Sequence, residues 1–228
     1  MIKNRTAQLV YLSMATAIGI IGVIASFGLF SYTFRWDFYI HFTNLSNYLC
    51  VGILIAELVQ TIKKKEDSYV STSPLLKFMG LLSIVLTFFV FNIMLAPTRE
   101  AYLNFTINST TFHIIIPIIY VVDWFLFYER KKVTWKYPLY SIVVPLIYVI
   151  FVFIHAWILG FDASIPNFNG NGSFIYPYFF LNIETQGVGG VLKWIAILAI
   201  AFVAVGYIFY GLNHITKKQK SKNQKDAQ

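Results

Sequence analysis

Charged residues are scarce in this chain. Asp, Glu, Lys and Arg make up 12% of its 228 residues, whereas hydrophobic residues make up 57%. A soluble domain of this length cannot bury so much apolar surface while carrying so few charges. A protein whose solvent is lipid can do so, and the charges that are present gather in short clusters between apolar runs. The composition therefore predicts an integral membrane protein.

Cysteine is nearly absent as well, because Cys50 is the only one. A single cysteine excludes an intramolecular disulfide and any multi-cysteine metal site. The sequence also lacks a Gly-x-Ser-x-Gly nucleophile elbow, a His-Glu-x-x-His zinc helix and a glycine-rich phosphate loop. No metal and no organic cofactor is therefore expected. The net charge of +8 does not indicate a nucleic-acid partner, because the basic residues lie beside apolar runs and act as topology signals.

Six apolar segments are long enough to cross a bilayer, which takes about 20 helical residues. We place them near residues 9–32, 38–62, 78–96, 111–128, 137–160 and 191–212. Together they predict an all-α integral membrane protein with six transmembrane helices in one domain. The basic, polar tail of residues 216–228 is expected to be disordered.

The distribution of Lys and Arg predicts the orientation. One side of the predicted bundle carries 15 of them and the other side carries 3, namely Arg35, Arg99 and Lys193. The larger set comprises Lys3, Arg5, Lys63, Lys64, Lys65, Lys77, Arg130, Lys131, Lys132, Lys136, Lys217, Lys218, Lys220, Lys222 and Lys225. The positive-inside rule then places both termini in the cytoplasm, which an even number of spans allows.

Small residues recur at four-residue spacing in the first segment, as Ala15 and Gly19 and then as Gly22 and Ser26. This spacing lets helix backbones approach closely, so we expect it to serve packing.

Polar residues recur near the outer ends of the spans. Thr43 and Asn47 are four residues apart and share a helix face. Thr43 is predicted to lie about 9 Å inside the span, at ~1.5 Å per residue. The same reasoning brings Asn92, His113 and His155 into one outer layer. Polar groups at such depths usually face a bundle interior and have partners there.

This layer has the groups that acyl transfer needs. A threonine hydroxyl becomes a nucleophile when a base takes its proton, and histidine is the usual base near neutral pH. The side-chain N–H groups of Asn47 or Asn92 can stabilise an oxyanion. Alternatively, all five residues only hydrogen-bond across helices and hold the bundle together.

Two carboxylates lie in the inner half of the predicted bundle. Glu57 either pairs with a loop lysine or reaches the interface, and Asp123 either pairs with a neighbouring helix or joins Glu57 in a proton path. A proton path would belong to a small transporter or channel.

The longest connection, residues 161–190, is rich in Asn, Gly and Pro before it becomes aromatic. A loop of this length is a lid or re-entrant segment, or else an interfacial helix.

Four motifs carry a resemblance to a known family. They are Phe42-Thr43-Asn44-Leu45-Ser46-Asn47, His113-Ile114-Ile115-Ile116-Pro117 followed by Asp123-Trp124, Trp135-Lys136-Tyr137-Pro138-Leu139-Tyr140, and Tyr176-Pro177-Tyr178-Phe179-Phe180-Leu181. In this order and spacing they resemble the androgen-induced-protein-like family of six-span membrane proteins and its bacterial relatives.

The resemblance implies a threonine hydrolase that cleaves fatty acid esters of hydroxy fatty acids. Thr43 would be the nucleophile and His113 the catalytic base, with His155 as the alternative base. The chain looks most like the bacterial relatives, which implies the plasma membrane of a bacterium, with a lipid or fatty acid ester as substrate. Relatives often have Pro and Asp where this chain has Phe179 and Asn182. If that Asp orients the base, Asn182 takes its place without the charge.

Overall fold

The computed structural model describes the whole chain except residues 1, 65–72, 99–104, 130, 169–171 and 216–228. The tail of residues 216–228, predicted to be disordered, therefore lies outside the described residues. The described part consists of helices, turns and one isolated β-bridge between Pro166 and Ser173. Its main elements are α1 (Arg5–Ser26), η1 (Leu29–Ser31), α2 (Phe42–Lys63), α3 (Pro74–Phe89), η2 (Val90–Leu95), η3 (Ala96–Thr98), α4 (Ile107–Thr110), η5 (Thr111–Ile115), α5 (Ile116–Phe127), α6 (Tyr137–Ser141), α7 (Val143–Ile158), η6 (Phe179–Leu181) and α8 (Ile183–His214).

Among the described residues, six helices are long and apolar enough to cross a membrane. They are Arg5–Ser26, Phe42–Lys63, Pro74–Leu95, Ile107–Phe127, Tyr137–Ile158 and Ile183–His214. Three of them join consecutive elements, because η2 continues α3, α4 and η5 run into α5, and α6 runs into α7. The predicted all-α class with six spans is thus confirmed at the level of length and hydropathy.

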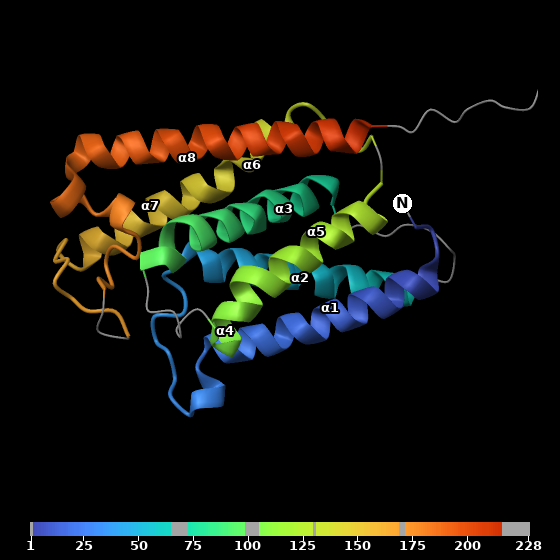
Figure 1. Cartoon of the computed structure of the whole chain (residues 1–228), viewed down its shortest axis with the longest axis horizontal. Helices are drawn as coiled ribbons and strands as arrows, with labels where there is room; N and C mark the ends of the chain where they lie inside the picture. Colours follow the sequence, from blue (N-terminus) through green and yellow to red (C-terminus); the bar gives the residue numbers. More distant parts are fainter. Residues whose placement is uncertain (1, 65–72, 99–104, 130, 169–171, 216–228) are drawn as a thin grey trace, which may run out of the picture.

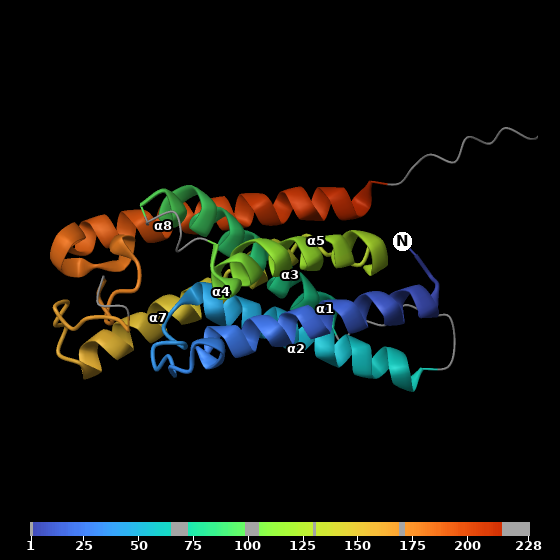
Figure 2. The same ribbon diagram turned by 60° about the horizontal axis from the view of Figure 1, so that its bottom comes forward.

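The helices run roughly along the long axis of the molecule, with α1 and α8 at opposite edges in Figure 1. Neighbouring helices pack in the order α1 on α2, α2 on α3 and α3 on α5, and α8 packs on α6 and α3. In Figure 2, turned by 60°, α8 remains at the edge of the bundle. The N-terminus and the end of α8 lie at one end, and the connections before α2 and before α8 lie at the other.

Two predicted boundaries near the N-terminus are wrong. The first helix ends at Ser26, six residues before the predicted end, because Gly28 adopts a left-handed conformation (φ 77°) that stops the helix. The second helix starts at Phe42, not at residue 38. The preceding residues form turns closed by the bonds Phe38 N–H to Arg35 O (3.3 Å) and Ile40 N–H to Asp37 O (3.2 Å). Thr43 therefore lies in the first turn of α2, nearer the helix end than predicted.

The start of the last helix was also misplaced. α8 begins at Ile183, eight residues before the predicted start at residue 191. The Asn182 side chain caps it, accepting hydrogen bonds from the N–H groups of Glu184 (2.9 Å) and Thr185 (3.3 Å). A bend at Gly187 (φ 64°, ψ 164°) follows, and the last residues of the predicted connection, 183–190, therefore belong to α8.

The small residues of α1 do serve packing. Ala15, Gly19, Gly22 and Ser26 are all buried. A Cβ atom added at Gly19 would lie 2.7 Å from a methyl group of Val51 on α2, so the two backbones meet there. This confirms the predicted role of the four-residue spacing.

Candidate active site

Thr43 is the second residue of α2 and is 5% exposed. The N-terminus of this helix has no side-chain cap from His41, so its first N–H groups need other partners. The Thr43 N–H donates to the hydroxyl of Tyr178, 3.2 Å away, from the connection before α8. The positive end of the α2 dipole thus lies at Thr43, which favours negative charge that develops there.

Two asparagine amides join the segments that carry Thr43 and His113. The Asn47 amide nitrogen donates to the carbonyl oxygens of Thr43 (2.7 Å) and of Phe112 (3.0 Å), and Phe112 precedes His113. The Asn92 amide nitrogen donates to the carbonyl oxygens of Phe88 (2.8 Å) and of His113 (3.1 Å). The structure therefore brings Thr43, Asn47, Asn92 and His113 into one connected group, taken from three separate spans.

Both carbonyl acceptors on the fourth span belong to a π-helical segment, η5 (Thr111–Ile115), and Asn92 lies in a second one, η2. A π turn displaces backbone groups from the regular i to i−4 pattern, and such turns recur at functional sites. Sequence periodicity does not reveal them.

The amide N–H groups of Asn47 and Asn92 are fully used in this arrangement. Each amide nitrogen has two N–H bonds, and each makes two hydrogen bonds to carbonyl oxygens. Neither has an N–H left for an oxyanion. Asn47 and Asn92 therefore link helices by hydrogen bonds. They do not serve as the oxyanion donors that the sequence predicts.

His113 is buried, and its environment orients the imidazole. Its Nδ1 lies 2.9 Å from the carbonyl oxygen of Ser109, and the ring stacks on Phe91 with centroids 3.5 Å apart and planes 6° apart. A carbonyl only accepts, so this bond assigns the proton to Nδ1 and leaves the lone pair on Nε2. That is the tautomer a general base needs.

His155, the alternative base, has different neighbours. It lies near the end of α7, with its Nε2 3.4 Å from the Tyr39 hydroxyl and its ring edge-on to Phe174 at 4.7 Å. These contacts come from the connections before α2 and before α8. The hydrogen bonds that join Thr43, Asn47, Asn92 and His113 do not include it.

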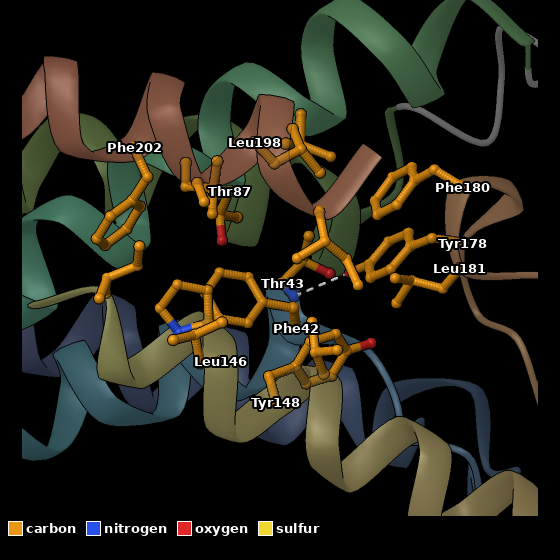
Figure 3. A pocket seen from close by; sticks show the side chains of 17 residues that line it. Phe42, Thr43, Thr87, Leu146, Tyr148, Tyr178, Phe180, Leu181, Leu198 and Phe202 are labelled. Carbon is orange, nitrogen blue, oxygen red and sulfur yellow. Dashed lines mark hydrogen bonds between the residues drawn. The ribbon is translucent and has the colours of Figure 1, made fainter. Parts of the chain in front are cut away.

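A cavity of about 70 Å³ adjoins Thr43 between α2, α3, α7 and α8 (Figure 3). Its lining is apolar except for four hydroxyl-bearing residues, Thr43, Thr87, Tyr148 and Tyr178. Thr87 shares a hydrogen bond with Ser46 (2.6 Å), and the Tyr148 hydroxyl donates to the carbonyl oxygen of Ile40 (2.8 Å). The cavity therefore offers a hydrocarbon-like space that Thr43 lines together with three other hydroxyl-bearing residues.

A groove of about 190 Å³ lies next to this cavity, between α3 and α8. The two spaces share Leu86, Val90, Leu198 and Phe202 in their linings. Exposed Phe89 and Ile93 border the groove, so it opens on the outer surface of the helix bundle.

Tyr178 is the site residue that sequence reasoning did not single out, although it belongs to one of the four motifs. Burial raises the pKa of its phenol to about 12, and hydrogen bonds from Thr43 and the Phe42 backbone lower it in part. The phenol is therefore protonated at neutral pH.

The inner-half carboxylates lie in a cluster of their own. The Lys77 ammonium binds Glu57 at 2.5 Å and also binds Asp123, and all three side chains are buried. Lys77 had been counted among the loop lysines, but it lies in the first turn of α3, inside the bundle. The prediction that Asp123 pairs with a neighbouring helix is confirmed, and Glu57 pairs with that same lysine.

Asp123 and Asn182, which we considered as possible supporting residues of the site, have contacts elsewhere. Asp123 contacts Lys77, and Asn182 caps α8. Among the described residues, no group of three or more His, Cys, Asp and Glu side chains is arranged to hold a metal ion.

Comparisons with known proteins leave the family unassigned. No family model matches the chain, and neither the curated proteins nor the solved structures contain a match.

Proposed function

We propose that this protein is a membrane-embedded lipid ester hydrolase in which Thr43 is the nucleophile and His113 the general base, as in the family that its motifs resemble. One observation carries the proposal. Thr43 is buried at the N-terminus of α2, lines an apolar cavity, and is connected through Asn47 to the segment that carries His113.

The chemistry follows from these groups. The Thr43 Oγ1 attacks the ester carbonyl carbon while its proton passes to the Nε2 atom of the His113 imidazole. The imidazolium gives this proton to the leaving alcohol, and an acyl-threonine remains. Water, deprotonated by the same imidazole, then releases the fatty acid and restores the threonine hydroxyl.

The apolar lining of the cavity supports a fatty acyl group as the part of the substrate that binds there. A fatty acyl chain that enters directly from lipid avoids water. The groove between α3 and α8, which opens on the bundle surface, adjoins the cavity. A fatty acid ester, such as one of a hydroxy fatty acid, meets both requirements.

The orientation belongs to the same proposal. With both termini in the cytoplasm of a bacterial cell, the end of the bundle where α2 begins faces outward, because it lies opposite the N-terminus. Thr43 is the second residue of α2 and so belongs to this end. The substrate then comes from the outer leaflet.

Ester hydrolysis by the purified protein in detergent or nanodiscs tests the proposal. We expect Thr43→Ala to lower kcat by on the order of 10⁴-fold or more, because the nucleophile is lost. We expect His113→Ala to lower it by about 10²–10⁴-fold, the range for loss of an acid–base group.

Two matched variants control for folding. Thr61 is a buried threonine of the same helix, bonded to Glu57 O (2.7 Å), and His214 contacts Tyr210 O (2.9 Å) as His113 contacts Ser109 O. Thr61→Ala and His214→Ala are expected to retain activity. An unchanged kcat in Thr43→Ala would disprove the nucleophile assignment.

The transporter or channel alternative has less support, because Glu57 and Asp123 each bind Lys77 and so have a structural partner. Ion flux through proteoliposomes that depends on Asp123, together with absent esterase activity, would favour it. Absence of both activities would favour a non-catalytic scaffold whose polar layer only joins helices.

A further inference from the structure

The oxyanion that forms during ester attack needs a hydrogen-bond donor beside the nucleophile. Neither asparagine amide supplies one, because all four N–H bonds already reach backbone carbonyls. The donor must instead come from the cavity that Thr43 lines.

Three hydroxyl-bearing side chains besides Thr43 line this cavity. Thr87 is engaged with Ser46, and Tyr148 donates to the Ile40 carbonyl. Tyr178 remains, and its oxygen lies 3.2 Å from the backbone nitrogen of Thr43 (Figure 3). Its oxygen accepts from that N–H group and also hydrogen-bonds the side chains of Thr43 and Tyr148. We expect its own O–H to turn toward a substrate that is bound at Thr43.

The position of the phenol is fixed from several sides. Its ring stacks on Phe180 with centroids 5.1 Å apart and planes 4° apart, and it meets the rings of His41 and Tyr148 edge-on, at 6.2 Å each. The Leu181 N–H also donates to the Tyr178 carbonyl at 3.0 Å. A donor held in this way needs little reorganisation during the reaction, which makes it effective.

We infer that the Tyr178 hydroxyl donates the hydrogen bond that stabilises the oxyanion formed when Thr43 attacks the ester carbonyl. The inference rests on the proposed function. The Thr43 proton goes to His113 and the carbonyl π electrons go to oxygen, while Tyr178 keeps its proton throughout. Its raised pKa is consistent with this, because a phenol with a pKa of about 12 is a donor at every physiological pH.

The test compares Tyr178→Phe with wild type and with Thr43→Ala in the same esterase assay. Loss of one oxyanion donor is expected to lower kcat by on the order of 100-fold with little change in KM. Tyr128→Phe is the matched control, because that buried hydroxyl donates to Pro74 O (3.1 Å), far from the cavity, and should leave kcat unchanged.

The failures are distinguishable. Wild-type kcat in Tyr178→Phe with an inactive Thr43→Ala would overturn the oxyanion assignment and leave the hydrolase intact. Full activity in Thr43→Ala would overturn both.

Replacement of Tyr178 by a fluorinated tyrosine covers the case in which the Phe variant does not fold. Fluorination lowers the phenol pKa and keeps the hydroxyl group. The phenol then loses its proton, and with it the hydrogen bond to the oxyanion, at a lower pH. We expect the alkaline limb of the kcat/KM profile to move to lower pH. An unmoved limb would overturn the inference, because a purely structural phenol would not shift it.

Discussion

A lysine inside a helix bundle needs partners, because an unpaired buried charge is far more costly than the pair it belongs to. Lys77 has two carboxylates, and its ammonium also lies 4.6 Å from the centre of the Tyr120 ring. Glu57, Lys77 and Asp123 belong to three different spans, so the cluster joins α2, α3 and α5. Its role in the bundle is structural, separate from the cavity beside Thr43.

We predict that Lys77→Met destabilises the protein by about 3–5 kcal/mol, because it leaves two carboxylates buried without their cation. Thermal unfolding in detergent measures the effect. Lys193→Met is the control, because Lys193 is exposed on α8. Adding Glu57→Gln and Asp123→Asn to Lys77→Met should recover much of the loss. An unchanged melting temperature in Lys77→Met would show that the ion pairs do not hold these helices.

Some of the site residues could be predicted from the sequence, and others could not. Thr43 and Asn47 are conspicuous, because they are polar in an apolar run. The prediction that Lys77 lies in a loop is wrong, because Lys77 is the fourth residue of α3 and a lysine so close to a helix start resembles a loop residue. Tyr178 has no distinctive local pattern, and its role depends on a contact between residues 135 positions apart.

Among the elements, α8 differs from the other spans. It lies at the edge of the bundle, and only Val191, Phe202, Gly206 and Asn213 among its residues are buried. Beside it run both the cavity near Thr43 and the groove that opens on the bundle surface. Under the proposed function, a peripheral helix that borders two apolar spaces would provide a lateral path from lipid to Thr43.

We predict that Ala201→Trp raises KM severalfold for palmitate esters and leaves butyrate esters unaffected. Ala201 lines the surface groove, and an indole there would block a long chain but not a short one. Ala204→Trp is the matched control, being exposed on the same helix outside both linings. Equal KM values for both esters in Ala201→Trp would exclude this path.

Element boundaries show where sequence patterns are insufficient. The six apolar runs predicted the six helices, because hydropathy over about 20 residues is a strong signal. Their ends depend on local chemistry, namely a left-handed Gly28, the turns before Phe42 and the Asn182 cap. The π segments η2 and η5 lie just before Pro97 and Pro117, and hydropathy alone does not locate them.

For the whole molecule, the orientation in the membrane would decide which leaflet supplies the substrate of the proposed hydrolase. The clusters of Lys and Arg predict cytoplasmic termini, and this prediction does not depend on Lys77, which lies inside the bundle. The connection between α1 and α2 then lies outside the cell, on the same side as Thr43.

Cysteine labelling of intact cells measures this orientation. In a Cys50→Ser background, a membrane-impermeant maleimide should label Tyr32→Cys, because Tyr32 is fully exposed between α1 and α2. Lys3→Cys should react only after the cells are opened. The reverse pattern would place the termini outside and the candidate site toward the cytoplasm.

The central claim is that Thr43 acts as a nucleophile, and covalent capture tests it most directly. The purified protein is treated with a fluorophosphonate, digested, and the modified residue is identified by mass spectrometry. We predict a phosphonyl adduct on the Thr43 hydroxyl that is absent from Thr43→Ala and slowed in His113→Ala. An adduct on Ser46, the hydroxyl one turn further along α2, or labelling that persists unchanged in Thr43→Ala, would contradict the claim.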